Sequence, residues 1–494
     1  VGKTFAFFIA DTEKPMPDFF IPLDKLNGAV NGDRVVTRLA KWDKADKKPE
    51  GEVVNVIKAE DMNDFAMKEL LIDGGFPLSF DAAVMKEANE LSDKITREEL
   101  KKRKDCRDIL TFTNEKCIGT KEKIYVSYPN LAGDVVLGNT IMIDDGKIEV
   151  KVSGIEKNGD VKVVVTLGGI LSSKKGLNLP DTKISLPALT EKDLADLEFI
   201  IDQQLDWVAL SFVRSVKDIV ILRSKLDEKK SKTKIIAKIE KPEALVNIRD
   251  IIIESDAIMV ARGDLGVELP VEQIPLIQKE LIRKCIHRAK PVIVATQMME
   301  SMIDRVKPNR SEITDVANAV LEGADAVMLS GETAAGKHPA LVVETMRKII
   351  AEVEKNEYRY NRSEDLKPQP HSPSFYSDAV CYNAAKMAED VSANALVGMT
   401  QSGYTAFMLS SYRPSSPLFI FTKEKSLVNQ LSLSWGVRAF YYSEEESLDD
   451  IVADQIDILK QRGFLKSGDS VINTGSTPVD QHLPTNLIKL TRVV

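Results

Sequence analysis

Apolar strands alternate with amphipathic helices from about residue 188 onward, and this alternation restricts the chain to a small set of folds. The helix "EKDLADLEFIIDQQ" precedes the strand "WVALSFV", and the same order recurs until "AVMLSGET". The strands are apolar at nearly every position, as parallel strands covered on both faces must be. Residues 188–360 are therefore predicted to form five strands of a parallel α/β sheet.

Polar residues follow these strands at their C-terminal ends, where a TIM barrel builds its active site. A complete barrel needs eight βα units, and five are recognisable here. The predicted fold class is therefore α/β, with a partial TIM (β/α) barrel. The strand-end residues are Ser211, Arg214, Lys238, Glu240, Asp264, Thr296, Ser330 and Glu332.

The rest of the chain shows other patterns. Short aromatic strands come first, then an amphipathic helical stretch, then short strands with Gly/Asp turns. A proline-rich linker leads to a second α/β series, which predicts a small doubly wound domain. The predicted divisions are an OB-like β segment at 1–58, a helical connector at 59–108, a partial β-domain at 109–187, the partial barrel at 188–360, the linker at 361–375 and the C-terminal α/β domain at 376–494.

The composition argues against several classes of protein. A net charge of −8 over 494 residues leaves the chain as a whole without a basic footprint for nucleic acid. No apolar run approaches the ~20 residues of a membrane span, so no membrane partner is expected. The four cysteines are far apart and form no CxxC pair, which argues against a disulfide framework or a zinc site. A reducing cytoplasm is the expected location.

The segment "TKIIAKIEKPEAL" places a lysine and a glutamate on one face of an apolar strand. Lys238 and Glu240 are two positions apart, and side chains with this spacing point to the same side of a strand. Burying both charges is costly unless they pair or bind a ligand. Taken alone, the two residues leave a structural ion pair and a binding site equally open.

Two more polar positions follow in the next βα units. Asp264 in "ARGDLGVE" adds a second carboxylate, and Mg²⁺ is commonly held by one or two carboxylates plus substrate oxygens. Backbone N–H groups of Gly263 and Asp264 at a helix start suit a small anion. Thr296 in "VATQMMES" adds a hydroxyl, for which a helix cap is the alternative. With Lys238 as a point charge, the set predicts metal-dependent phosphoryl or enolate chemistry.

Several long motifs, in order along the chain, resemble the pyruvate kinase family. They are "SSKKGLNLP", "KIIAKIEKPEAL", "IMVARGDLGVELP", "PVIVATQMMESMI" and "TDVANAVLEGADAVMLSGETAAGKHP". The resemblance runs from about Ile109 to the C-terminus. It implies transfer of the phosphoryl group of phosphoenolpyruvate to ADP, which gives pyruvate and ATP in glycolysis.

The same resemblance implies a role for individual residues. Mg²⁺ or Mn²⁺ is the expected divalent cofactor, and the Thr296 hydroxyl is expected near the enolate face that is protonated. The implied assignments are catalytic for Lys238 and Thr296, metal-binding for Glu240 and Asp264, substrate-binding for Gly263, Asp264 and Thr296, and nucleotide-binding for Lys175.

Some segments of the family have no counterpart in this sequence. In the family, three βα units with "NFSHG"-like and "DTKGPEIR"-like motifs come early, and neither motif occurs here. K⁺ is a family cofactor whose ligands are not found in this chain. We expect the missing contacts to lower activity, because electrostatic preorganisation is usually the largest catalytic contribution. A homotetramer is the assembly that the family implies.

The turn "MTQSGYTA" in the C-terminal domain is a candidate phosphate site. The resemblance implies an allosteric sugar-phosphate site in this domain, and a polar turn before a helix suits a phosphate. An ordinary turn with a capped helix is the alternative. The candidate effector-binding residues are Thr400, Ser402, Gly403, Tyr404 and Thr405.

Residues 1–108 resemble a different family, the ribonuclease II/R exoribonucleases. "KTFAFFI" and "DFFIPLDKLNGAVNGDRV" look like strands of a cold-shock-type OB domain, whereas the nuclease core is absent. Single-stranded RNA is therefore a candidate partner of residues 1–58, although packing in an aromatic core is the alternative for at least half of the rings. The candidate residues are Phe5, Phe7, Phe19 and Phe20 for base stacking, with Lys3 and Arg34 on phosphates.

The two resemblances meet near "RDILTFTNEKCIGT", at residues 107–120. A junction that lacks parts of both families suggests a fused or mis-joined reading frame as one hypothesis. The alternative function is a single-stranded RNA-binding module fused to an inactive kinase remnant.

Overall fold

The computed structural model describes two compact units of the chain, Val1–Lys102 and Arg103–Val494, and each is considered by itself. The predicted phosphate contact Lys3 and most of the predicted helical connector lie outside the described residues. None of the described helices is long and apolar enough to cross a membrane. The described residues are 1–2, 4–10, 16–42, 49–57, 71, 82–90, 108–180, 182, 184–185, 187–355, 360–361, 366–443, 447–478, 481 and 483–494.

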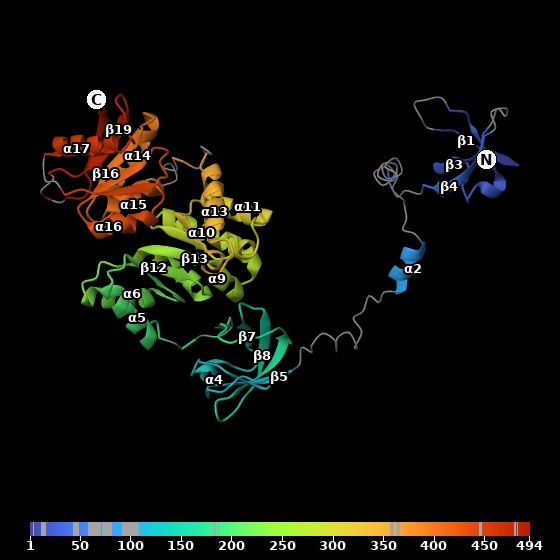
Figure 1. Ribbon diagram of the computed structural model, residues 1–494, viewed down its shortest axis with the longest axis horizontal. Coiled ribbons are helices and arrows are strands. Elements are labelled where there is room, and N and C mark those ends of the chain that lie inside the picture. The colour runs from blue at the N-terminus through green and yellow to red at the C-terminus, as the bar shows by residue number, and fades with distance from the viewer. Residues whose placement is uncertain are drawn as a thin grey trace. The chain divides into compact units, whose positions relative to one another are not determined.

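Short strands form the sheet of the first unit, in blue in Figure 1. The elements are β1 (Phe5–Phe8), β2 (Phe19–Pro22), η1 (Leu23–Lys25), β3 (Val35–Lys41), β4 (Glu50–Val56) and α2 (Ala82–Glu90). β1 pairs antiparallel with β2, β2 pairs parallel with β4, and β4 pairs antiparallel with β3. Alternate side chains point inward, and Ala6, Phe19, Ile21 and Val53 form a small core. The sheet confirms the predicted N-terminal β segment.

A mostly antiparallel sheet opens the second unit. Its elements are β5 (Ile109–Thr113), β6 (Lys123–Tyr125), α4 (Leu131–Asp134), β7 (Thr140–Ile143), β8 (Ile148–Ile155), β9 (Val161–Leu167) and β10 (Leu177–Asn178). The strand order is β10-β7-β8-β9-β5-β6. Val150, Val152, Val161 and Val163 alternate with exposed polar residues, so one face of the sheet forms a closed apolar core.

The next sheet has five parallel strands in the order of the sequence, as the β/α alternation predicted. The strands are β11 (Trp207–Leu210), β12 (Lys234–Ile239), β13 (Ala257–Ala261), β14 (Val292–Ala295) and β15 (Ala326–Val327). Every residue of β13 and β14 is buried, which explains their uninterrupted apolar sequence. The five strands confirm the partial barrel.

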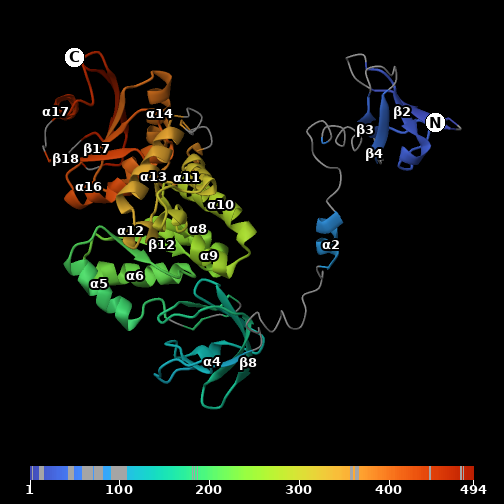
Figure 2. The same ribbon diagram turned by 45° about the vertical axis from the view of Figure 1, so that its right-hand side comes forward.

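Helices connect these strands and cover the outer face of the sheet (Figure 2). They are α5 (Glu191–Asp202), α6 (Val216–Glu228), α7 (Pro242–Val246), α8 (Ile248–Glu254), α9 (Arg262–Glu268), η2 (Val271–Gln273), α10 (Ile274–Ile286), η3 (Glu300–Ile303), α11 (Arg310–Glu322), α12 (Gly331–Ala334) and α13 (Pro339–Val353). Capping boxes at Thr190, Ser215 and Asn309 fix the starts of α5, α6 and α11. The segment between β12 and β13 is divided at Asn247 into two short helices, α7 and α8.

The C-terminal domain is a second parallel sheet with one antiparallel edge strand. Its elements are α14 (Phe375–Asp390), β16 (Ala395–Met399), α15 (Tyr404–Ser411), β17 (Leu418–Thr422), α16 (Lys425–Gln430), η6 (Leu431–Leu433), β18 (Val437–Tyr441), α17 (Leu448–Gln461), β19 (Ser470–Gly475) and β20 (Leu487–Arg492). The order is β18-β17-β16-β19-β20. One core lies on the face that contacts α14 and α15, and another on the face that contacts α17. Cores on both faces confirm the predicted doubly wound domain.

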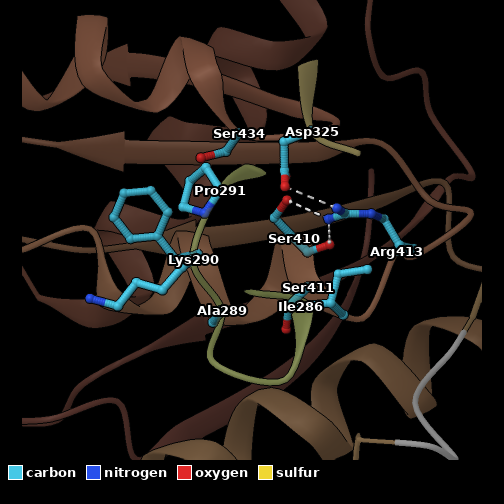
Figure 3. Close-up of a pocket in the computed structure, with 10 residues that line it drawn as sticks. Ile286, Ala289, Lys290, Pro291, Asp325, Ser410, Ser411, Arg413 and Ser434 are labelled. Carbon is cyan, nitrogen blue, oxygen red and sulfur yellow. Dashed lines mark hydrogen bonds and ion pairs between the residues drawn. The ribbon is translucent and has the colours of Figure 1, made fainter. Parts of the chain in front are cut away.

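A buried ion pair joins the C-terminal domain to the five-stranded sheet (Figure 3). Arg413 is 2% exposed, and its Nη2 lies 3.2 Å from Asp325 Oδ2 and donates to the Gly323 carbonyl at 2.7 Å. Asp325 also accepts hydrogen bonds from the backbone N–H groups of Val292 and Trp435. One carboxylate therefore ties β14, the segment before β15 and the C-terminal domain together.

Replacing Arg413 with methionine is expected to lower the free energy of unfolding by about 3–5 kcal/mol, because Asp325 would be left as an uncompensated buried charge. Chemical denaturation of the full chain measures the change. Lys348→Met is the matched control, since Lys348 forms an exposed pair with Glu344, and such pairs contribute roughly 0–1 kcal/mol. An equal loss of unfolding free energy in the two variants would show that the buried Arg413–Asp325 pair contributes no more than an exposed ion pair.

Candidate active site

The Lys238–Glu240 pair lies at the carboxyl end of β12, on the edge where the parallel strands β11 to β15 all end. Glu240 is almost fully buried, and its Oε1 lies 2.6 Å from Lys238 Nζ. The other carboxylate oxygen accepts the backbone N–H of Phe212 at 2.6 Å. Lys238 Nζ also donates to Ser211 Oγ at 2.8 Å, and its side chain keeps 24% of its exposure. The Lys238 ammonium is therefore held by a buried carboxylate and remains accessible at the end of the strand.

Asp264 and Gly263 begin α9, directly after β13. Burial raises the pKa of the Asp264 carboxyl above its usual value, and the Glu240 carboxylate raises it further, whereas Lys238 opposes the shift. Because β12 and β13 pair in parallel, Glu240 and Asp264 follow neighbouring strands at the same edge of the sheet. Two negatively charged carboxylates in a partly buried position repel each other, and a bound cation would lower this electrostatic energy.

The Thr296 hydroxyl lies at the end of β14 and is held from two sides. Its Oγ1 accepts the backbone N–H of Gly263 at 2.7 Å and donates to the Ala295 carbonyl at 2.6 Å. The backbone of Thr296 is left-handed, with φ of 69°, which is uncommon for a β-branched residue. The hydroxyl thus links the end of β14 to the first turn of α9, where it satisfies a helix N–H as the cap alternative predicted.

Arg262 also supports the position of Thr296, a role that the sequence motifs alone did not indicate. Its guanidinium donates to the Thr296 carbonyl at 2.7 Å and pairs with Asp315 of α11 at 2.6 Å. The side chain thereby fixes the unusual backbone of Thr296 against α11. The signal in the sequence was the arginine of "ARGD" itself, but its direction toward the next strand depends on the tertiary structure.

The residues present fit a hard divalent cation. Glu240 and Asp264 offer carboxylate oxygens at neighbouring strand ends. Burial first, and the Glu240 charge second, raise the pKa of Asp264, and a bound cation would oppose both effects. No group of three or more His, Cys, Asp or Glu in the described residues is arranged to hold a metal. A cation here would therefore take its remaining ligands from substrate oxygens and water, as Mg²⁺ commonly does.

The antiparallel sheet approaches this site through the turn between β7 and β8. Lys175 Nζ pairs with Asp144 of that turn at 2.9 Å, and the adjacent Asp145 is one of the charges that raise the pKa of Asp264. A buried pair, Lys241 with Glu268 at 2.5 Å, lies beside β10. Lys175 therefore lies in the segment before β10, outside the five-stranded sheet whose strand ends carry the other site residues.

A pocket of about 630 Å³ lies in the C-terminal domain beside the turn "MTQSGYTA". Thr400, Ser402, Tyr404 and Thr405 line the pocket. Gly403 turns the chain with φ of 89°, and its N–H donates to Thr400 Oγ1 at 3.1 Å. The Thr405 hydroxyl is buried 2.6 Å from that of Thr485. Four of the five candidate effector-binding residues thus surround one cavity, and the fifth shapes the turn.

The aromatic residues of the first unit divide between two faces of their sheet. The ring centroids of Phe5, Phe7 and Phe20 lie 5.3–6.4 Å from one another, and Phe5 and Phe7 are about two-fifths exposed. Phe19 is only 6% exposed and packs in the core with Ile21. The prediction that Phe19 stacks on bases is therefore wrong, because neighbouring residues on a strand face opposite sides.

Three families match parts of this chain. "Pyruvate kinase, barrel domain" matches residues 90–343, which is about half of the chain, and "Pyruvate kinase, alpha/beta domain" matches residues 378–491. "Cold shock domain" matches residues 7–81. The two pyruvate kinase matches cover the five-stranded sheet, the strand-end cluster and the C-terminal domain.

Curated relatives and solved structures agree with these matches. Pyruvate kinase of Mycobacterium intracellulare is 42% identical over 386 residues, which cover 78% of this chain and 80% of that protein. Pyruvate kinase of Geobacillus stearothermophilus is also 42% identical, over 77% of this chain and 65% of that protein. A crystal structure of a pyruvate kinase from Cryptosporidium parvum aligns with a TM-score of 0.72 and 34% identity, over 79% of each chain. This chain belongs to the pyruvate kinase family.

Proposed function

We propose that this chain transfers the phosphoryl group of phosphoenolpyruvate to ADP, giving pyruvate and ATP. The observation that carries the proposal is the cluster at the ends of β12, β13 and β14, where Lys238 pairs with Glu240 and Thr296 accepts the N–H of Gly263, next to Asp264. Two carboxylates, a lysine and a fixed hydroxyl are the groups that metal-assisted phosphoryl transfer needs. Relatives that are pyruvate kinases support the same reaction.

Lys238 supplies the fixed positive charge of this site. Negative charge spreads over the transferring phosphoryl oxygens in the transition state, and a positioned ammonium stabilises it. Glu240 and Ser211 hold Nζ in place at 2.6 and 2.8 Å, so little reorganisation is needed. Glu240 and Asp264 would hold Mg²⁺ or Mn²⁺, which supplies charge neutralisation and orientation of the phosphate oxygens. Glu240 would therefore contact both the Lys238 ammonium and the divalent cation.

Phosphoryl transfer leaves an enolate, which must gain a proton at carbon to become pyruvate. Thr296 Oγ1 is fixed by Gly263 and Ala295 at the end of the adjacent strand. We assign this hydroxyl to the relay of a proton from bound water to the enolate carbon. The backbone N–H groups at the start of α9, including that of Asp264, would contact the substrate's anionic groups.

Lys175 is assigned to the nucleotide. It lies in the segment before β10, and its partner Asp144 lies beside Asp145, whose charge reaches Asp264. An ammonium outside the five-stranded sheet suits the phosphates of ADP opposite the strand ends. K⁺ dependence, a homotetramer and a cytoplasmic location are further expectations that follow from the family.

The C-terminal pocket is assigned to a sugar-phosphate effector. Its turn combines hydroxyls of Thr400, Ser402 and Thr405 with the start of α15, and it opens into a cavity of about 630 Å³. The partial positive charge of a helix start and neighbouring hydroxyls suit a phosphate group. Binding there would regulate the transfer and would not take part in it.

Lys238→Met is expected to lower pyruvate formation by about 100-fold or more, because one positioned electrostatic contact is lost. The assay uses purified full chain of verified mass with phosphoenolpyruvate, ADP, Mg²⁺ and K⁺. Lys225→Met, which removes an exposed lysine of α6, is the control and should leave the rate unchanged. If the unsubstituted chain forms no pyruvate, the proposed activity of this chain is wrong.

Gly263→Ala is expected to lower kcat by about tenfold or more, since small displacements of catalytic groups strongly reduce the rate. A Cβ at this position would meet Thr296 Oγ1 at 3.3 Å and would push the hydroxyl away from its place. Gly266→Ala, in the same helix α9, is the matched control. Its Cβ would meet side-chain carbons only at 3.8–4.0 Å. Similar rates in both variants would remove Thr296 from the mechanism.

Single-stranded RNA binding is a second candidate function, located in the first unit. The observation that favours it is the cluster of Phe5, Phe7 and Phe20, whose rings lie on one face of the sheet. Aromatic rings on a sheet face stack bases without strong sequence preference. The match of residues 7–81 to the cold shock domain supports this candidate.

Phe7→Ala is expected to weaken binding of a single-stranded oligonucleotide about tenfold, which corresponds to the loss of one stacked base. Fluorescence anisotropy at several salt concentrations would measure the affinity. The slope with salt should stay unchanged, because phosphate contacts are kept. Val30→Ala, at an exposed apolar residue outside the cluster, is the control. Equal affinities for both variants would rule out the aromatic face as the binding surface.

A further inference from the structure

A second buried ion pair lies next to the candidate active site, and the proposed reaction does not use it. Lys241 Nζ lies 2.5 Å from Glu268 Oε1, and the two side chains keep only 7% and 2% of their exposure. Lys241 directly follows Glu240 in the chain, and Glu268 is the last residue of α9. Burying two charges is costly, and apolar residues of similar volume are often as stable. Stability alone therefore does not explain the pair.

Glu268 has a further partner on the antiparallel sheet. Asn178 of β10 donates its Nδ2 to Glu268 Oε1 at 3.5 Å, a long hydrogen bond, and Asn178 is itself buried. β10 pairs with β7, and Asp144 follows β7 directly. Lys175 lies in the segment that leads to Asn178 and pairs with Asp144 at 2.9 Å. The Glu268 carboxylate is therefore connected to the segment that carries Lys175.

The pair is also connected to the strand-end residues. Asp264 and Glu268 are four residues apart in α9, so they lie on the same face of that helix. Lys241 Nζ lies 6.0 Å from the centroid of the Phe212 ring, and the Phe212 N–H donates to Glu240. The pair therefore contacts the elements that carry both candidate metal ligands.

We propose that Lys241, Glu268 and Asn178 form a buried bridge that positions Lys175 relative to the carboxylates at the strand ends. The proposal rests on the proposed function, in which Lys175 contacts the nucleotide. The three residues of the buried bridge touch no substrate and act as positioning residues. Hydrogen bonds to a buried carboxylate are strong and directional, so they hold β10 at one distance from α9. A displacement of about 1 Å at a reacting group can lower a rate on the order of 100-fold.

Spin labels on the two sides of the buried bridge test its positioning role without any reaction. Exposed positions of β8 and α6 take the labels through Lys151→Cys and Lys217→Cys, in a full chain with Cys106→Ser and Cys117→Ser. Double electron–electron resonance is expected to give one narrow distance distribution for this parent chain. Asn178→Leu should broaden the distribution, because it removes the amide donor and keeps a similar volume.

A combined variant tests whether the three residues act together. Lys241→Met with Glu268→Leu removes both charges and keeps the volume, so folding is expected to be retained. This variant should broaden the distribution as Asn178→Leu does, and adding Asn178→Leu to it should have no further effect. Asn158→Leu is the matched control, because Asn158 Nδ2 also donates to a carboxylate, that of Asp160, beyond the opposite end of β8. A thermal melt of each variant verifies its folding.

The second readout depends on the proposed function. Asn178→Leu is expected to raise KM for ADP about tenfold, because Lys175 is displaced from the nucleotide phosphates. KM for phosphoenolpyruvate should change little, since Lys238 and Thr296 keep their own partners. A merely structural role would lower the fraction of folded chain and would leave both KM values unchanged.

Each outcome decides between these possibilities. A broadened distribution with a selective rise in KM for ADP supports the proposal. A narrow distribution in every variant, or a parent chain as broad as Asn178→Leu, overturns the buried bridge whatever the activity. A broadened distribution with an unchanged KM for ADP overturns the positioning of Lys175. If the parent chain forms no pyruvate, the proposed function is wrong, and the distance distributions alone decide whether the buried bridge positions the sheet.

Discussion

Parallel pairing of β11 to β15 is the constraint on which the candidate site depends. Parallel strands in register end at one edge, so residues far apart in the sequence are brought to the same place. Lys238 and Thr296 are separated by two βα units, yet each comes directly after the apolar part of its strand. The buried strands make this edge rigid, because shifting one strand would expose apolar residues on both faces.

Glu240 is the buried carboxylate at this edge, and its charge must be compensated by neighbouring groups. A nearly fully buried carboxylate requires partners for both oxygens, and Lys238 and the Phe212 backbone provide them. The same requirement holds Lys238 in place, and Lys238 is the group that the proposed reaction uses. Asp264 is less well compensated than Glu240, because burial and the Glu240 charge raise its pKa. A bound cation would stabilise its ionised form. Stability and chemistry therefore depend on the same charges.

A buried ion pair also holds the C-terminal domain to the five-stranded sheet. Arg413 lies just beyond the end of α15, and its guanidinium reaches Asp325 and Gly323 before β15. The opposite end of α15 begins at the turn with Gly403, beside the large pocket. A single short helix thus contacts both the pocket and the junction. The pocket therefore lies within one helix length of the segment that precedes the last strand of the five-stranded sheet.

The helices and strands, and the polar residues at the strand ends, follow from the amino-acid sequence alone. Uninterrupted apolar runs predicted parallel strands, and Lys238 with Glu240 predicted a shared face, because both patterns follow from local geometry. Which side chains meet across elements depends, in contrast, on how distant segments pack. The support of Thr296 by Arg262, the burial of Phe19 and the junction at Arg413 rest on packing between distant segments, and no local pattern encodes such contacts.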